Sequence, residues 1–444
     1  MSRSTRIKVA AAVAVAALSL AACSSGGGSP ASTAGAGTAG AANPTTLTFW
    51  HYEGDDSAMA QSWNAAIKEF EAANPGVTVK VEKQTFEQLQ KNAKIVLAGN
   101  DVPDVMEYNK GNATAGQLAS QGLLTDLSAD AKKYGWDSKL SSSVQTTAKY
   151  DDNGLMGSGK WYGVPSYGEY VTVFYNKDMF DKYGISVPTN FADFEKALAT
   201  FKQNGVTPLA EAGAEYPLGQ LWYELVLNKA DRSFVDNFEL FKGNVDFTSG
   251  PLLDGTNTLA DWVSKGYISK DSSGLKAEDM GTAFIAGKYP IMVSGSWWFG
   301  RLNKEVTSFK LGQFTFPGNT LNPGSSGNLL VIPKNAKNKD LAAKFIDATL
   351  GKTAQNTSAQ LGGLPVAGDS SVITDENTKV LQQNFDSIVK NDGLAFYPDW
   401  PVPGFYDQLV SFGQSIVNGS KSPTDALAAL GQYYDSGRKD LTGK

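Results

Sequence analysis

Short runs that mix aromatic and planar polar residues recur along this chain of 444 residues, which carries 9 Trp, 17 Tyr and 22 Phe. Residues 50–53 read Trp-His-Tyr-Glu, and residues 108–110 read Tyr-Asn-Lys. Rings offer flat apolar faces, while the amides and carboxylates beside them offer hydrogen bonds. A carbohydrate has C–H faces and a rim of hydroxyls, so this mixture of side chains suits a sugar-binding site.

The composition argues against several other chemistries. Histidine and cysteine occur once each, as His51 and Cys23. A structural zinc site needs four such ligands and an internal disulfide needs two cysteines, so we expect no metal, no cofactor and no disulfide. The acidic run at residues 151–154 lacks the alternating oxygen ligands of a calcium loop, which favours a plain turn.

Strand and helix patterns alternate in the first part of the chain and position the first two runs. Residues 46–50, 77–81 and 103–108 read as strands with helical patterns between them. This order predicts an α/β fold with a parallel sheet and helices on its faces. Ligands bind at the carboxyl ends of the strands in such sheets, so the loops at 50–56 and 108–112 are candidate binding loops.

The remaining elements follow less regularly, and no tandem repeat is found. The periodicity predicts strands at 170–175, 289–294 and 329–332, and helices at 189–201, 221–227, 252–263, 280–285 and 340–350, with a C-terminal helical pair capped at Ser422. Helix stripes or turns explain Trp63, Trp136, Trp161 and Trp262, which we therefore assign to packing.

The N-terminus has the order of an export signal. Basic residues come first, an apolar run spans 9–20, and small residues precede Cys23. The apolar run is shorter than the ~20 residues that a membrane-spanning helix requires. The ending Leu-Ala-Ala-Cys resembles a bacterial lipobox, which implies cleavage of residues 1–22 and lipid attachment at Cys23. The protein would then lie outside the cytoplasm, anchored to the outer face of the cell membrane through lipid alone.

Residues 23–44 read as a flexible tether of Gly, Ala, Ser and Thr. The Gly-x-Gly-x-x-Gly match at 35–40 has no strand before it, so we interpret it as a low-complexity coincidence. Removal of the signal takes away three basic residues and no acidic one, which lowers the formal net charge from −6 to −9. A net acidic protein is a poor nucleic-acid binder.

An ordered set of motifs gives the chain a resemblance to a known family. They are Pro103-Asp104-Val105, the Gln-Gly-Leu-Leu-Thr-Asp-Leu run at 121–127, Tyr-Gly-Val-Pro at 162–165, Phe-Tyr-Asn-Lys-Asp-Met-Phe at 174–180, Gly-Ser-Trp at 295–297, and the segment 331–346. Their types and order resemble the extracellular solute-binding proteins of ATP-binding-cassette importers, in particular the oligosaccharide-binding lipoproteins of family 1.

This resemblance implies a two-lobed, periplasmic-binding-protein-like α/β fold with hinge crossings and a solute cleft between the lobes. Lobe one would comprise 45–165 plus 328–364, and lobe two 166–326 plus 366–444. The protein would be no enzyme. It would be a monomer that captures an oligosaccharide of two to four units and delivers it to permease subunits served by a cytoplasmic ATPase.

The resemblance and the aromatic–polar runs together define a candidate ligand site. Trp297 is the best candidate for a stacking ring, and Trp400 is preferred in the late aromatic segment. For His51, a structural role and ligand contact are equally plausible at this stage. The complete set of candidate ligand residues is Trp50, His51, Tyr52, Glu53, Tyr108, Asn109, Tyr167, Glu169, Tyr216, Trp222, Trp297, Trp298, Arg301, Asn328, Trp400 and Phe405.

Two other functions remain open from the sequence. A secreted glycoside hydrolase needs two carboxylates across a cleft, and several Glu residues are available, namely Glu53, Glu107, Glu169 and Glu215. A non-sugar solute is the second alternative. An anionic solute would favour clustered arginines, whereas Arg232, Arg301 and Arg438 are widely spaced.

Overall fold

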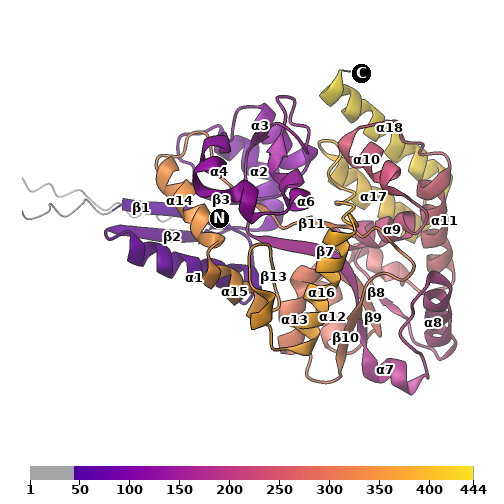
Figure 1. The fold of residues 1–444 in the computed structure, drawn as a ribbon. Helices are drawn as coiled ribbons and strands as arrows, with labels where there is room; N and C mark the ends of the chain where they lie inside the picture. The colour runs from indigo at the N-terminus through magenta and orange to yellow at the C-terminus, as the bar shows by residue number, and fades with distance from the viewer. Residues whose placement is uncertain (1–44, 444) are drawn as a thin grey trace, which may run out of the picture. The chain divides into compact units, whose positions relative to one another are not determined.

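The computed structural model describes residues 45–443, which lie within one compact unit (Figure 1). The predicted signal segment 1–22, Cys23 and the tether 23–44 lie outside the described residues. Two sheets organise the unit, and a separate two-stranded ribbon pairs β4 (Lys149–Tyr150) with β5 (Lys160–Trp161). None of the helices in residues 45–443 combines the length and apolar character needed to cross a bilayer.

The first sheet has the strand order β2-β1-β3-β12-β6. Its parallel part joins β1 (Thr45–His51) to β2 (Val77–Lys83) and β3 (Val105–Tyr108), as the alternation of strand and helix predicted. The strands β12 (Leu329–Val331) and β6 (Val164–Pro165) continue the sheet in antiparallel pairing.

The connecting helices of this part begin at polar caps. Helix α1 (Ala58–Ala73) starts where the Ser57 side chain accepts from the Ala60 N–H, and α2 (Phe86–Leu97) starts where Thr85 accepts from the Gln88 N–H. Trp63 lies on the buried face of α1, which packs against α14 (Lys339–Thr349) and α15 (Lys352–Gln360).

The second sheet is built around one long strand, β7 (Tyr167–Asn176), all of whose residues are buried. It pairs antiparallel with β9 (Ile291–Gly295), β10 (Leu311–Phe314), β11 (Gly324–Ser326) and β13 (Leu364–Pro365), and β8 (Leu209–Ala210) lies parallel to β9. The predicted strands at 170–175 and 289–294 are therefore present with shifted ends.

Helices cover the second sheet and form the C-terminal part. Helix α9 packs on β9 and α11, α16 packs on β7 and β10, and α17 packs on α18 and α9. The helices of four or more residues not yet given are α3 (Gln117–Ser120), α4 (Ser128–Tyr134), α5 (Trp136–Lys139), α6 (Ser142–Gln145), α7 (Lys177–Lys182), α8 (Phe191–Gln203), α9 (Pro217–Leu227), α10 (Arg232–Leu240), α11 (Gly250–Ser264), α12 (Ala277–Ile285), α13 (Phe299–Glu305), α16 (Glu376–Lys390), α17 (Phe405–Asn418) and α18 (Pro423–Thr442). The π-helical turn η1 spans Asn112–Gly116, and the 3-10 turns are η2 (Thr146–Ala148), η3 (Lys270–Gly274), η4 (Ser296–Trp298) and η5 (Ser370–Val372).

The chain passes between the two sheets at short connections. It leaves the first sheet after β6 and enters β7 two residues later, and it returns between β11 and β12. The predicted lobe bounds stay a prediction. The packing assignments of the four tryptophans are confirmed, because Trp63, Trp136, Trp161 and Trp262 are all buried.

Candidate functional site

A cavity of about 210 Å³ lies where the carboxyl ends of the first-sheet strands meet the loops of the second sheet. Ligand sites occur at this position in open α/β sheets. It is lined by Tyr52, Glu53, Phe86, Asn109, Lys110, Tyr167, Glu169, Tyr216, Gln220, Trp297, Asn328, Tyr397, Asp399, Trp400 and Tyr406.

Glu107 supports the floor of the cavity from the buried strand β3. It accepts hydrogen bonds from the Tyr52 backbone N–H (3.1 Å) and from the Asn328 amide (3.0 Å), and the Tyr167 hydroxyl lies 3.4 Å away. These bonds connect the ends of three first-sheet strands to the start of β7. Tyr52, Asn328 and Tyr167 are therefore held in fixed positions along the cavity wall.

Lys110 is the one cation of the cavity lining, and it is almost fully buried. Its ammonium group pairs with the Glu169 carboxylate and donates to the Asn328 amide oxygen at 3.0 Å. It also lies 5.2 Å from the centroids of the Tyr397 and Trp400 rings, within cation–π range. The lysine thus connects the first sheet to the second across the cavity floor.

The opposite wall is aromatic. Trp297 makes edge contact with Tyr216 (5.7 Å between ring centroids) and lies 6.1 Å from Tyr397, which in turn packs on Trp400 at 5.2 Å. The Trp297 indole N–H is 3.3 Å from the Tyr216 hydroxyl oxygen. Trp297 is only partly buried, so part of its ring surface is available for stacking.

Gly111 permits the close approach that places Trp400. Its φ is +112°, and a Cβ at this position would lie 2.6 Å from the Trp400 ring. Only glycine satisfies both the backbone conformation and the space. The neighbouring turn η1 is then held against the 399–401 segment, because the Ala113 N–H donates to the Trp400 carbonyl at 2.9 Å.

The cavity carboxyl groups are shifted toward the protonated form. Desolvation raises the pKa of Glu107 to about 7 and that of Asp399 to about 6, even though hydrogen bonds and Lys110 favour ionisation. Desolvation, followed by repulsion from Glu107 and Glu169, raises the pKa of Glu53. Burial also raises the pKa of Glu169 against the opposing effect of Lys110. Protonated carboxyls can donate as well as accept, which suits hydroxyl ligands.

The sequence profile of the bacterial extracellular solute-binding protein family matches residues 56–356. The chain belongs to this family. Solute-binding proteins of this kind are extracellular binding components rather than enzymes, as expected from the sequence.

Relatives and solved structures agree with the family assignment. The diacetylchitobiose-binding protein DasA of Streptomyces coelicolor is 25% identical over 394 residues, which are 86% of this chain and 87% of DasA. The multiple sugar-binding protein of Streptococcus mutans is 25% identical, with 71% of this chain and 74% of the relative covered. A solved chitin oligosaccharide binding protein has a TM-score of 0.74 at 22% identity, covering 89% and 99% of the two chains. This likeness confirms the periplasmic-binding-protein fold.

In this solute-binding protein, nine of the sixteen predicted ligand residues line the cavity. They come from both sheets and from the loops between them, although contact with a ligand stays a prediction. The nine are Tyr52, Glu53, Asn109, Tyr167, Glu169, Tyr216, Trp297, Asn328 and Trp400.

Two predicted residues of the first strand do not reach the cavity. His51 is buried in β1 against Phe49 and Trp63, away from the cavity. Desolvation lowers its pKa to about 4. This placement favours a structural role for His51, which is one of the two roles that the sequence left open. Trp50 lies in register with Glu82 of β2. Trp50 and His51 still belong to β1 and point to the two faces of the sheet, whereas Tyr52 and Glu53 follow the end of the strand and reach the cavity.

Five further predicted residues do not line this cavity. Phe405 is buried in the C-terminal core, and the buried Trp222 ring donates to the Thr256 hydroxyl at 2.9 Å. Trp298 is buried beside Trp297, while Arg301 lies over Trp298 and pairs with Glu278 and Glu305 outside the cavity. Tyr108 lines a neighbouring cavity instead.

Six cavity residues were absent from the predicted set: Phe86, Lys110, Gln220, Tyr397, Asp399 and Tyr406. Lys110 belongs to the run at 108–110, and Tyr397 and Asp399 lie within three residues of Trp400, so proximity to predicted residues was a usable signal. Phe86 and Gln220 sit within amphipathic helices and carry no such signal. Within residues 45–443, no group of three or more His, Cys, Asp or Glu side chains is placed to hold a metal ion.

Proposed function

We propose that this protein binds a carbohydrate in the described cavity as the solute-binding component of an ATP-binding-cassette importer. The observation that carries the proposal is the cavity lining itself. Trp297 and Tyr216, which are only partly buried, supply ring surface, while Glu53, Asn109 and other amides and carboxylates supply hydrogen bonds. Sugars need both, because each unpaired polar group buried on binding costs about 1–3 kcal/mol.

We propose an oligosaccharide of two to four units as the ligand. The names of both curated relatives refer to sugars, and DasA is named for diacetylchitobiose. The cavity holds one cation already paired with Glu169, so it offers no free positive charge for an anionic solute.

Binding is expected to close a hinge between two lobes. Lobe one would comprise 45–165 plus 328–364, and lobe two 166–326 plus 366–444. Supporting this division, the cavity takes residues from both ranges, so a bound sugar would contact both lobes and stabilise their closed arrangement.

We further propose a lipid anchor at Cys23 and delivery to permease subunits, with the protein acting as a monomer. Support for the anchor comes from the lipobox-like ending at 20–23 and the tether that follows. ATP hydrolysis would be supplied by the cytoplasmic ATPase of the importer.

Thermal unfolding with a sugar panel tests the proposed function. A ligand that binds only the folded state at 100 times its Kd adds about 2.7 kcal/mol to the unfolding free energy, which is a shift of several degrees. We expect such a shift with at least one di- to tetrasaccharide and unchanged sugar on recovery. Hydrolysed sugar, or stabilisation by a non-sugar solute alone, would contradict the proposal.

A further inference from the structure

A strained stretch of backbone, residues 392–396, leads directly into the part of the cavity wall at 397–400. Residues 397–400 contribute a tyrosine, an aspartate and a tryptophan to the cavity lining. Within the described residues 45–443, three residues other than glycine have a positive φ, and two of them, Asp392 (+53°) and Phe396 (+61°), belong to the strained stretch. Such conformations are unfavourable for residues with a side chain and persist only where the surrounding structure holds them.

Side chains from two helices hold three carbonyl groups of the strained stretch. Arg232 begins α10 and donates to the Leu394 carbonyl at 2.8 Å and to the Asp392 carbonyl. The Tyr223 hydroxyl of α9 donates to the Ala395 carbonyl at 3.1 Å. A guanidinium group presents several N–H donors in one plane, so a single arginine can hold two carbonyls at once.

Backbone bonds hold the other two carbonyl groups and tie the strained stretch to β11. The Asn322 N–H donates to the Gly393 carbonyl at 2.8 Å, and the Gly324 N–H donates to the Phe396 carbonyl at 3.1 Å. Gly324 begins β11, and the next residue of this strand is in register with Glu169 of β7. The strained stretch is therefore fixed on one side by α9 and α10 and on the other by the strand that pairs beside Glu169.

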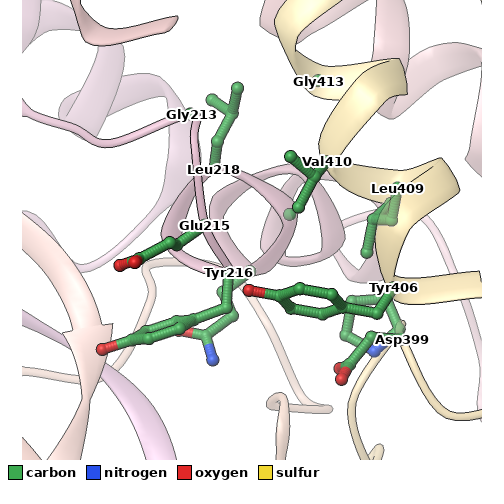
Figure 2. Close-up of a pocket in the computed structure, with 12 residues that line it drawn as sticks. Gly213, Glu215, Tyr216, Leu218, Asp399, Tyr406, Leu409, Val410 and Gly413 are labelled. Atoms are coloured by element: carbon green, nitrogen blue, oxygen red, sulfur yellow. The ribbon is translucent and has the colours of Figure 1, made fainter. Parts of the chain in front are cut away.

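A small displacement of residues 397–400 would alter the cavity. Tyr397 lies 6.1 Å from Trp297, measured between ring centroids. Figure 2 shows Asp399 beside Tyr406, which extends from α17. Because a binding site must be held to within about 0.5 Å by its supporting residues, the contacts that fix the strained stretch also bear on the affinity of the site.

Arg232 acts on the cavity from outside it. It does not line the cavity, and 29% of its side chain is exposed. Its Nε also lies 3.3 Å from the Asp392 carboxylate, but that side chain is 79% exposed, so the ion pair contributes little. The bond to the carbonyl of the buried Leu394 is charge-assisted and shielded from water. The carbonyl bonds are therefore the contacts through which Arg232 fixes the strained stretch.

We propose that Arg232 is a positioning residue for solute binding, because it holds the strained stretch and thereby keeps residues 397–400 in the geometry that binds the ligand. The inference rests on the proposed function and adds to it a residue outside the cavity lining. Without Arg232, two carbonyl groups lose their donor, and the unfavourable φ values at Asp392 and Phe396 are held less firmly. Ligand binding would then have to order this part of the wall, which lowers the affinity.

Titration calorimetry on matched variants tests this role. The ligand is whichever xylo-, cello-, malto- or chito-oligosaccharide of two to four units binds the wild-type protein. We expect Arg232→Ala to weaken binding about five- to twentyfold, and Arg232→Lys, which keeps the charge but lacks the planar fork, to lose less. Asp392→Asn removes the surface ion pair but keeps a residue that tolerates positive φ, so its affinity should stay within about twofold of the wild type.

A second variant removes another bond to the strained stretch without touching Arg232. Tyr223→Phe keeps the buried ring and loses the bond to the Ala395 carbonyl. We expect it to weaken binding about two- to fivefold, because the stretch is then less well ordered before the ligand arrives. This variant and Arg232→Lys keep the test decisive if Arg232→Ala does not fold.

Arg438→Ala is the control for a purely structural role. The Arg438 guanidinium lies over the ring of Phe241, the residue that follows α10, at 5.5 Å from the ring centroid, and it does not line the cavity. Urea unfolding should show a loss of stability in both alanine variants. Only Arg232→Ala should weaken sugar binding by the folded protein.

Unchanged affinity in the Arg232 variants, or an equal loss in Asp392→Asn or Arg438→Ala, would overturn the positioning role and leave the proposed function intact. If the wild-type protein bound no sugar of any series, the proposed function would itself fail, and this inference with it.

Discussion

Single side chains decide whether the cavity can hold a flat sugar face, and Trp297 is the most direct case. It is only partly buried, and its ring lies between Tyr216 and Tyr397. We expect Trp297→Ala to lower sugar affinity by about tenfold or more, while Trp297→Phe keeps a ring and loses less. Titration calorimetry on both variants gives the comparison. Equal sugar affinities of the wild type and Trp297→Ala would show that the Trp297 ring does not contribute to binding.

Lys110 and Glu169 form an ion pair whose side chains are only 3% and 6% exposed. Removing one partner leaves a buried charge without compensation, which costs about 3–5 kcal/mol. We therefore expect Lys110→Met to destabilise the protein strongly and the double change Lys110→Met with Glu169→Gln to recover part of the loss. Urea unfolding measures both. A double variant no more stable than the single one would show that the pair is not coupled.

Glu211 gives the clearest prediction for pH, because it is 3% exposed and lies outside the cavity. Burial raises its pKa to about 8, and the Ala212 N–H opposes the shift only partly. The folded state therefore holds a proton that the unfolded chain releases near its ordinary pKa of 4.5. The resulting stability is complete below pH 4.5 and is lost as the pH rises to about 8.

The slope of this loss can reach about 1.4 kcal/mol per pH unit for one group. Unfolding free energies measured from pH 5 to 8 should fall less steeply in Glu211→Gln than in the wild type. Parallel curves of unfolding free energy against pH for the two proteins would contradict the raised pKa of Glu211.

At the scale of elements, the connection from β3 into η1 holds the aromatic wall in place. We expect Gly111→Ala to cost about 1–3 kcal/mol or more and to weaken ligand binding, because a Cβ would meet Trp400 at a backbone φ of +112°. Gly122→Ala is the control, since Gly122 also has a positive φ (+69°) but open space around its Cα. Only Gly111→Ala should reduce affinity. Equal losses of affinity in Gly111→Ala and Gly122→Ala would mean that backbone strain alone is responsible.

The elements that sequence could predict are those with local signals. Strand alternation predicted β1, β2 and β3, and all are present; the Thr85 cap at the start of α2 is a local signal of the same kind. Helices α10 and α16 were not predicted, although both begin at Asp caps, at Asp231 and Asp375. Both also carry buried apolar residues at helical spacing, Val235 and Phe238 in α10 and Leu381, Phe385 and Ile388 in α16, so the local signals for these two helices were present in the sequence.

Sequence patterns also predicted only part of the candidate site. Residues of one run share a location in sequence, but β1 ends at His51, so His51 is buried in the sheet whereas Glu53 lies beyond the strand and lines the cavity. Tyr406 and Phe86 are separated by more than 300 residues and meet only because α2 and α17 approach each other in the fold. Such pairs depend on tertiary packing, for which single-sequence patterns carry no signal.

At the scale of the whole molecule, three side-chain contacts join segments of the two predicted lobes. These contacts pair Lys110 with Glu169, Tyr406 with Glu87, and the Asn112 amide with the Glu239 carbonyl (3.0 Å). These contacts hold segments of the two predicted lobes together near the cavity. Opening of the proposed hinge would break these contacts.

Isothermal titration calorimetry of the wild-type protein tests most directly whether this cavity binds a sugar. The panel would hold di- to tetrasaccharides of the xylan, β-glucan, maltodextrin, chitin and α-galactoside series. We predict saturable binding at one site per chain for at least one series, with no turnover. Absence of binding across the panel, together with tight binding of a non-sugar solute, would contradict it.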